Sequence, residues 1–158
     1  MKLNLACGNK KLEGYIGVDL HGGDVRADIL ALPKEWSGKA DEILIVHGLE
    51  HLAFYQTQAA LAEWRRVLKP GGLLAIECPN LKEACRQFLM DPSKLNRGIW
   101  PIYGDQTQGR IEDVHKSGWT PESLMKELQT AGFREVAQAP AQFKLREPRD
   151  FRVEARKP

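Results

Sequence analysis

The feature that most constrains the fold is the alternation of short, continuous apolar runs with segments of helical periodicity. Two of the runs, Ile43–Val46 and Leu73–Ile76, contain no alternating polar residues. Continuous apolar strands are typical of a sheet that is covered by helices on both faces. The sequence therefore predicts a mostly parallel α/β sheet with right-handed crossovers. Strands are predicted at Lys2–Ala6, Tyr15–Val18, Glu42–Val46, Leu73–Cys78, Glu135–Ala139 and Phe151–Ala155.

Two helices lie between these strands. The first is predicted over Thr57–Leu68, where the apolar residues fall on one helical stripe, and it ends before Pro70 because proline cannot continue a helix. The second begins at Thr120, which suits the N-cap, and Pro121 suits the first helical position. Gly132 is in position to cap its C-terminus.

Composition narrows the class of protein. The chain has 158 residues, 42% hydrophobic and 28% charged, which indicates one globular domain over residues 1–158. Its 23 basic and 21 acidic residues leave a net charge of +2, too small to favour a protein that coats nucleic acid. No apolar run has the roughly 20 residues that span a bilayer, and the first residues contain no signal-peptide stretch. Three unpaired cysteines indicate free thiols, so we expect a soluble, cytoplasmic protein.

The first loop contains the earliest signal of a binding site. Gly8 follows the first strand, where a residue without a side chain lets the backbone approach a ligand. Asp19 ends the second strand, where a carboxylate can accept hydrogen bonds from both hydroxyls of a ribose. An ordinary tight turn followed by a strand-ending aspartate explains these two residues equally well.

Longer motifs resemble a known family. Leu61–Gly72, with the wording Leu-Ala-Glu-Trp-Arg-Arg-Val-Leu-Lys-Pro-Gly-Gly, is the most specific, and Asp41–Leu52 contains a Leu-Glu-His turn. The chain resembles the class I S-adenosylmethionine-dependent methyltransferases, in their short form with a truncated first helix. This resemblance implies a Rossmann-like methyltransferase sandwich: a mostly parallel sheet with an antiparallel C-terminal strand and helices on both faces. The other matching segments are Leu3–Gly8, Tyr15–Leu20, Ala27–Pro33 and Asp113–Phe133.

The resemblance also implies a cofactor site for S-adenosylmethionine. Ala6 and Gly8 would pass under the methionine part, Asp19 would hold the ribose, and Leu20 would pack on the adenine ring. The cofactor-binding residues are predicted to be Ala6, Cys7, Gly8, Asp19, Leu20, Asp28, Ile29 and His47, with Asp28 meeting the adenine amino group.

This sequence departs from the family pattern in its first motif. Asn4 occupies the position of the usual acid, Ala6 that of the first glycine and Lys10 that of the third. The 11 positions from Gly8 to Asp19 are too few for a full crossover helix. The first helix is therefore predicted to be very short or replaced by a loop.

Histidines are the candidate catalytic residues, because an unperturbed imidazole titrates near neutral pH. His47 follows the fourth strand of the resemblance and His115 lies in the matching C-terminal segment, so these two are predicted to be catalytic. The alternatives are that His47 only lines the pocket and that His115 packs the lid. His51 is a third candidate base. A structural role is favoured for it, in which His51 lies at the start of a helix and its side chain forms hydrogen bonds with the neighbouring backbone. The histidines and Cys7 match no compact metal-binding spacing, and no metal site is predicted.

Residues 91–119 show no strong periodicity and are rich in glycine and proline. We expect no regular element there, but a lid that closes over the cofactor cleft and supplies the acceptor site, with His115 near a hinge at Gly118. Trp100, Tyr103 and Trp119 either form an aromatic wall or pack the segment onto the sheet, and packing is favoured for at least one of them.

The predicted function is methyl transfer to a small-molecule acceptor, with the oligomeric state left open. One alternative is a catalytically silent protein that binds S-adenosylmethionine or acts as a scaffold, since the first motif is incomplete and the first helix is missing. A nicotinamide-dependent oxidoreductase is disfavoured, because it needs a fuller glycine motif. RNA is a less favoured acceptor, because a charged edge strand explains the basic C-terminal residues equally well. These residues are Lys144, Arg146, Arg149, Arg152, Arg156 and Lys157, interspersed with Glu147, Asp150 and Glu154.

Overall fold

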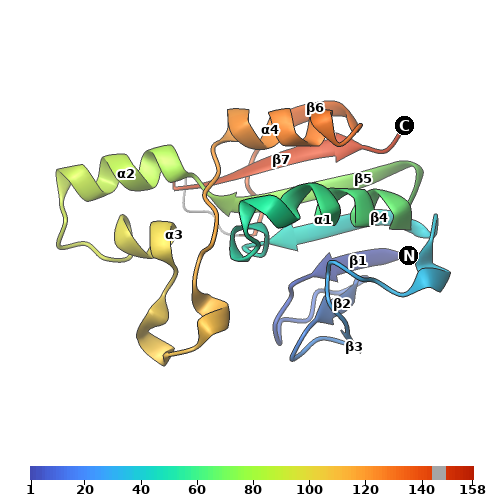
Figure 1. Cartoon of the computed structure of the whole chain (residues 1–158), viewed down its shortest axis with the longest axis horizontal. Helices are drawn as coiled ribbons and strands as arrows, with labels where there is room; N and C mark the ends of the chain where they lie inside the picture. Colours follow the sequence, from blue (N-terminus) through green and yellow to red (C-terminus); the bar gives the residue numbers. More distant parts are fainter. Residues whose placement is uncertain (144–148) are drawn as a thin grey trace.

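The computed structural model describes residues 1–143 and 149–158 and contains a seven-stranded sheet in the order β3-β2-β1-β4-β5-β7-β6 (Figure 1). Neighbouring strands from β3 to β5 are parallel, and β7 is antiparallel to both of its neighbours. The predicted sheet, with its antiparallel C-terminal strand, is confirmed. The strands are β1 (Lys2–Leu5), β2 (Ile16–Asp19), β3 (Val25–Arg26), β4 (Ala40–Val46), β5 (Leu68–Pro79), β6 (Arg134–Ala139) and β7 (Asp150–Arg156).

Both predicted helices are present, as α1 and α4. The Thr120 hydroxyl accepts a hydrogen bond from the Ser123 amide at 3.2 Å, and Gly132 follows α4 with a φ of +83°. The cap and the glycine that were predicted therefore bound α4. The α-helices are α1 (Phe54–Val67), α2 (Leu81–Met90), α3 (Ile99–Tyr103) and α4 (Pro121–Thr130), and the short 3₁₀ helices are η1 (Lys34–Trp36), η2 (Leu49–His51), η3 (Gln106–Gln108) and η4 (Ile111–Asp113).

The two faces of the sheet are covered differently. Figure 1 shows α1 and α4 in front of the sheet, and their apolar residues, such as Trp64 and Leu124, join one core cluster with the strands. Strand residues outside that cluster include Glu42, which forms an ion pair with Lys2 at 2.8 Å, and Arg152. The prediction of helices on both faces is thus confirmed for the face that α1 and α4 cover.

The connections contain both expected and unexpected elements. The segment between β1 and β2 is a loop, as predicted from its length. The expectation that residues 91–119 hold no regular element is wrong, because α3, η3 and η4 lie there. Pro101 is tolerated in α3 because it occupies the first turn, where a backbone N–H has no helical partner. In the chain that the structure describes, none of the helices has the length and apolar character required to cross a membrane.

Candidate active site

The carboxyl ends of the parallel strands β1 and β4 meet at one edge of the sheet, and both end in unusual backbone. Ala6 and His47, the residues directly after these strands, have φ values of +53° and +54°. A left-handed backbone is costly for a residue with a side chain, by about 1–3 kcal/mol, and persists where the surroundings fix it. A Cβ atom on Gly48 would lie 2.7 Å from the Ala6 Cβ, so the two strand ends approach closely. Strained residues of this kind are concentrated at functional sites.

The loop after β1 is organised by Asp19. Its Oδ2 accepts a hydrogen bond from the Gly8 amide at 2.9 Å, and its Oδ1 accepts from the amides of His21 at 2.9 Å and Gly22 at 3.2 Å. Gly8 has a φ of +57°, and a Cβ atom there would meet nothing within 4 Å. The backbone at Gly8 is therefore open to a ligand.

Cys7 and Gly22 have structural roles in this loop. The Cys7 Sγ lies 2.9 Å from the Cβ position of Gly17, so the thiol fills the space between the loop and β2, and burial raises its pKa. A Cβ atom on Gly22 would lie 2.5 Å from the Gly8 carbonyl oxygen. Gly22 was not singled out in the sequence, although the Gly-Gly pair at this point indicates close backbone packing.

The remaining predicted cofactor residues follow β2 and β3. Leu20 is 57% exposed, which leaves an apolar side chain available next to Asp19. Asp28 accepts a hydrogen bond from the Leu30 amide at 2.8 Å, and Ile29 is buried. The Ile29 carbonyl accepts a hydrogen bond from the Trp64 indole at 2.9 Å, which fixes this segment to α1.

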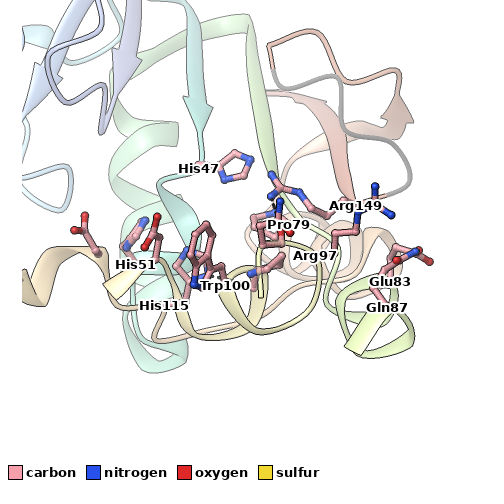
Figure 2. A pocket seen from close by; sticks show the side chains of 13 residues that line it. His47, His51, Pro79, Glu83, Gln87, Arg97, Trp100, His115 and Arg149 are labelled. Carbon is pink, nitrogen blue, oxygen red and sulfur yellow. Dashed lines mark hydrogen bonds between the residues drawn. The ribbon is translucent and has the colours of Figure 1, made fainter. Parts of the chain in front are cut away.

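A cavity of about 830 Å³ opens at the same strand edge (Figure 2). Of the predicted site residues, only His47 and His115 line it, and the other seven cofactor residues lie outside its wall. The wall comes from distant parts of the chain: His47, His51, Pro79, Glu83, Gln87, Asn96, Arg97, Trp100, Pro101, Asp105, Asp113, His115 and Arg149. The structure thus brings the two predicted catalytic histidines into one cavity, and the residues of the Gly8 loop are not among those that line it.

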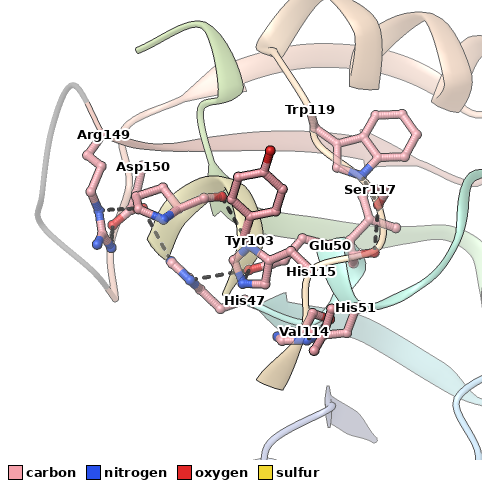
Figure 3. Close-up of polar contacts among 12 residues, drawn as sticks. His47, Glu50, His51, Tyr103, Val114, His115, Ser117, Trp119, Arg149 and Asp150 are labelled. Atoms are coloured by element: carbon pink, nitrogen blue, oxygen red, sulfur yellow. Dashed lines mark hydrogen bonds and ion pairs between the residues drawn. The ribbon is translucent and has the colours of Figure 1, made fainter. Parts of the chain in front are cut away.

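His47 lies between two buried carboxylates (Figure 3). Its Nδ1 is 3.3 Å from Glu50 Oε1, and its Nε2 is 3.4 Å from Asp150 Oδ1. Arg149 donates to both oxygens of Asp150, at 3.1 and 2.7 Å. Burial tends to raise the pKa of Asp150, but the hydrogen bonds from His47 and Arg149 outweigh it and hold the pKa below its usual range. Asp150 is therefore ionised at neutral pH.

His51 and His115 lie on the other side of Glu50. His115 Nδ1 is 3.0 Å from the Pro101 carbonyl oxygen, and its Nε2 is 3.9 Å from Glu50 Oε1. His51 Nδ1 is 3.2 Å from the Val114 carbonyl oxygen, and burial lowers the pKa of this imidazole. The His51 and His115 rings meet edge to face, with their centres 4.9 Å apart.

Three residues of this cluster were missed in the sequence. Glu50, Arg149 and Asp150 were noted only as part of a turn or of the charged C-terminal stretch. Glu50 is 2% exposed, and the spacing of His47, Glu50 and His51 is the signal that would have found it, because residues three and four apart often meet. Arg149 and Asp150 had no local signal.

A metal ion could be held by Glu50, His51 and His115, whose ligand atoms all lie within 4.8 Å of one another. Cys7, which was considered as a ligand with the histidines, does not belong to this group.

The aromatic residues of the 91–119 segment have different roles. Trp100 lines the cavity, and Tyr103 is 57% exposed. Trp119 is buried, and its indole donates to the Ser117 hydroxyl at 3.0 Å. Trp119 thus packs the segment onto the domain, as favoured for at least one of the three.

The sheet order, with β7 inserted antiparallel between β5 and β6, and the cavity at the carboxyl edge define a Rossmann-like methyltransferase fold. Residues 3–76 match the family model described as a methyltransferase domain. This match covers slightly less than half of the chain, and together with the solved structures below it shows the fold of the class I S-adenosylmethionine-dependent methyltransferases.

Three solved structures illustrate the likeness. An S-adenosylmethionine-dependent methyltransferase from Archaeoglobus fulgidus is 20% identical, with a TM-score of 0.64 over 99% of this chain and 85% of the other. A protein from Pyrococcus horikoshii OT3 is 16% identical, with a TM-score of 0.70 over 99% and 81% of the two chains. Human N-acetylserotonin methyltransferase in complex with S-adenosylmethionine is 20% identical, with a TM-score of 0.56 over 94% and 35%. No protein with a curated description matches the sequence.

Proposed function

We propose that the chain transfers a methyl group from S-adenosylmethionine to a small-molecule acceptor in the cavity. The observation that carries this proposal is His47, which follows β4 beside the first loop, lines the cavity and lies between two buried carboxylates. The cavity volume of about 830 Å³ is within the usual range for small-molecule sites.

The first loop and the segments after β2 and β3 fit the cofactor at four residues. The space at Gly8 is open, which suits the methionine part, and the Asp19 carboxylate at the end of β2 suits the ribose hydroxyls. The exposed Leu20 suits the adenine ring, and Asp28 its amino group. Bound S-adenosylmethionine would supply a methyl group already activated by a positively charged sulfur.

His47 would act as the general base. An oxygen or nitrogen acceptor loses a proton as it gains the methyl group, and a ring nitrogen of His47 would take that proton. The negative charges of Glu50 and Asp150 would stabilise the imidazolium that forms, because charge interactions are strong in a buried site. His115 lines the same cavity and would orient the acceptor.

The cavity wall favours a polar acceptor. Arg97 and Arg149 line it together with Glu83, Asp105 and Asp113, and Trp100 adds an aromatic surface. Charged groups of both signs favour a small molecule that carries several polar groups.

RNA is less well supported as an acceptor. Arg152 is paired with Glu77 at 3.0 Å and with Glu154 at 2.7 Å, and Lys157 donates to the Leu68 carbonyl at 2.7 Å. These cations are engaged within the domain. Lys144, Arg146 and Glu147 of the predicted basic stretch lie outside the described residues.

The test is the formation of S-adenosylhomocysteine with a panel of polar small molecules, followed by the variant His47→Asn. Asparagine tolerates the left-handed backbone of position 47 but is no base. Turnover is expected to fall by about 10²–10⁴-fold, with calorimetric affinity for S-adenosylmethionine nearly unchanged. Binding of the cofactor without turnover on any acceptor would instead support the silent binding protein.

A further inference from the structure

Glu50, His51 and His115 converge although they come from two separated segments. Glu50 and His51 end the short helix η2, and His115 lies between η4 and α4. Backbone hydrogen bonds hold the two segments together, because the Glu50 carbonyl accepts from the amides of Lys116 at 2.8 Å and Ser117 at 3.1 Å. These hydrogen bonds therefore hold the two segments that carry the cluster next to each other.

The hydrogen bonds of the two histidines select one tautomer for each ring. A backbone carbonyl can only accept a hydrogen bond, so the proton lies on Nδ1 of His51, facing Val114, and on Nδ1 of His115, facing Pro101. In a neutral ring with its proton on Nδ1, Nε2 is the nitrogen that can ligate a metal ion. Histidines that ligate metal ions commonly donate their other N–H to a backbone carbonyl or carboxylate in this way.

Glu50 completes the set. Its Oε1 is 3.9 Å from His115 Nε2, and the ligand atoms of the three residues lie within 4.8 Å of one another. An ion bound at 2.0–2.2 Å would hold its ligands roughly 3–3.6 Å apart, so rotations that move the ligand atoms by about 1 Å would close the site. His47 Nδ1, 3.3 Å from the same carboxylate oxygen, would orient Glu50 from outside the ligand set.

We propose that Glu50, His51 and His115 bind one divalent transition-metal ion with open positions toward the cavity. Two imidazoles and a carboxylate suit Zn²⁺, Fe²⁺ or Co²⁺, and three protein ligands with an open position are typical of a reactive metal site. His51 and His115 both line the cavity, so the open positions face the space for the acceptor. In a second step, which rests on the proposed function, a hydroxyl or carboxylate oxygen of the acceptor binds there and is polarised by the ion.

Metal binding is tested on the full chain, stripped with a chelator and free of cofactor and acceptor. Co²⁺ is added and visible absorption is recorded, and Zn²⁺ is titrated in competition with a chromophoric chelator. We expect one equivalent of ion per chain, and a rise in the unfolding temperature with Zn²⁺. Glu50→Gln and His115→Ala should each weaken binding by about 100-fold or more.

His21→Ala is the matched control, because His21 is 72% exposed and lies beside Glu112, outside the proposed ligand set. This variant should bind the ion like the wild type. The proposal is overturned if the wild type takes up no Co²⁺ or Zn²⁺, or if His21→Ala weakens binding as much as His115→Ala. The metal titration of the wild type tests the proposal even if a site variant does not fold. Calorimetry of S-adenosylmethionine on the stripped protein tests the proposed function separately.

Discussion

At the scale of single residues, the site combines an open glycine loop with a histidine between carboxylates. Asp19 accepts hydrogen bonds from three backbone amides, and it is also the residue that we propose to bind the ribose hydroxyls. Gly8 contributes by having no side chain, which leaves the space in front of the loop open for a ligand. These two residues give the most direct tests of the cofactor site.

Asp19→Ala should weaken binding of S-adenosylmethionine by about tenfold to a hundredfold. The variant loses charge-assisted hydrogen bonds worth roughly 1.5–3 kcal/mol and also the contacts that order the first loop. Isothermal calorimetry measures the affinity, with circular dichroism as the folding control. Asp28→Asn should weaken binding less, and a larger effect than that of Asp19→Ala would reverse the two roles. Unchanged affinity in folded Asp19→Ala would contradict the ribose assignment.

Gly8→Val should abolish cofactor binding while unfolding stays cooperative. The new side chain would enter the open space in front of the loop, and the φ of +57° adds backbone strain. Gly38→Val is the matched control, because Gly38 also has a positive φ, of +65°, with open space at its Cβ position. Backbone strain should lower the stability of both variants. Only Gly8→Val should also lose affinity for S-adenosylmethionine, because its side chain enters the space in front of the loop. Normal binding by Gly8→Val would make the loop an ordinary turn.

At the scale of elements, α1 holds the segment that follows β3. Glu63 Oε1 accepts from the Leu32 amide at 2.8 Å, and Arg66 donates to both Glu63 oxygens at 2.7 and 2.8 Å. The helix thereby positions the segment that contains Asp28. The 91–119 segment contributes part of the wall of the cavity.

Glu63→Gln should lower the free energy of unfolding by about 1–2 kcal/mol at pH 7. The hydrogen bond from Arg66 holds the pKa of Glu63 below its usual value of 4.5. The carboxylate therefore stabilises the fold above that pH, and the contribution disappears as the pH falls through the lowered folded-state pKa. Urea unfolding at pH 7 and about pH 3 should show the difference from wild type shrinking. Glu13→Gln, at an exposed loop residue, serves as the control, and a pH-independent difference would contradict the assignment.

Only part of residues 91–119 is free of contacts that would prevent it from moving as a lid. Gly118 packs against Leu81, and the amides of Lys116 and Ser117 are bonded to Glu50, which argues against a hinge at Gly118. Residues 105–112 are exposed. Their amides should exchange rapidly in the free protein and more slowly with cofactor and acceptor bound. Lys116 and Ser117 are internal controls that should stay protected.

His115→Ala tests the same lid by function. Turnover should fall, because the acceptor loses a contact in the cavity, while affinity for S-adenosylmethionine stays nearly intact. Equal protection of the amides of residues 105–112 with and without ligand would show that the segment is a fixed wall.

At the scale of the whole molecule, the antiparallel strand β7 ties the domain together on the face away from α1 and α4. Arg152 bonds to Glu77 of β5 at 3.0 Å, and Glu77 also accepts from the amides of Gln142 at 2.7 Å and Phe143 at 3.0 Å. Both side chains of this ion pair are buried. The pair therefore joins β5, β7 and the loop after β6.

Arg152→Met should lower the free energy of unfolding by roughly 3–5 kcal/mol, because it leaves the buried charge of Glu77 without its cation. Arg156→Met is the control on the same strand. Arg156 lies 3.5 Å from Glu135 in an exposed pair, and its loss should cost less than about 1 kcal/mol. Chemical denaturation of both variants measures the difference, and equal losses would mean that burial of the Glu77 pair is unimportant.

Local patterns determined much of the fold in advance. The apolar runs, the Thr120 cap and the stop at Pro70 act over a few residues, so six strands, α1, α4 and the loop in place of a first helix could be predicted from the sequence. The two-residue strand β3, the helix α2 and the helix α3 were missed, since such elements depend on tertiary contacts more than on periodicity.

The candidate site was predicted only in part. His47 could be found because it directly follows a predicted strand, and His115 because its segment resembles a family motif. The joining of His47 to Asp150 required the tertiary structure. Antiparallel pairing of β7 with β5 sets Asp150 opposite Pro79, at the same sheet edge as His47, although about a hundred residues separate the two in sequence. Strand order and direction decided that contact, because they depend on burial of the whole sheet and not on any local run of residues.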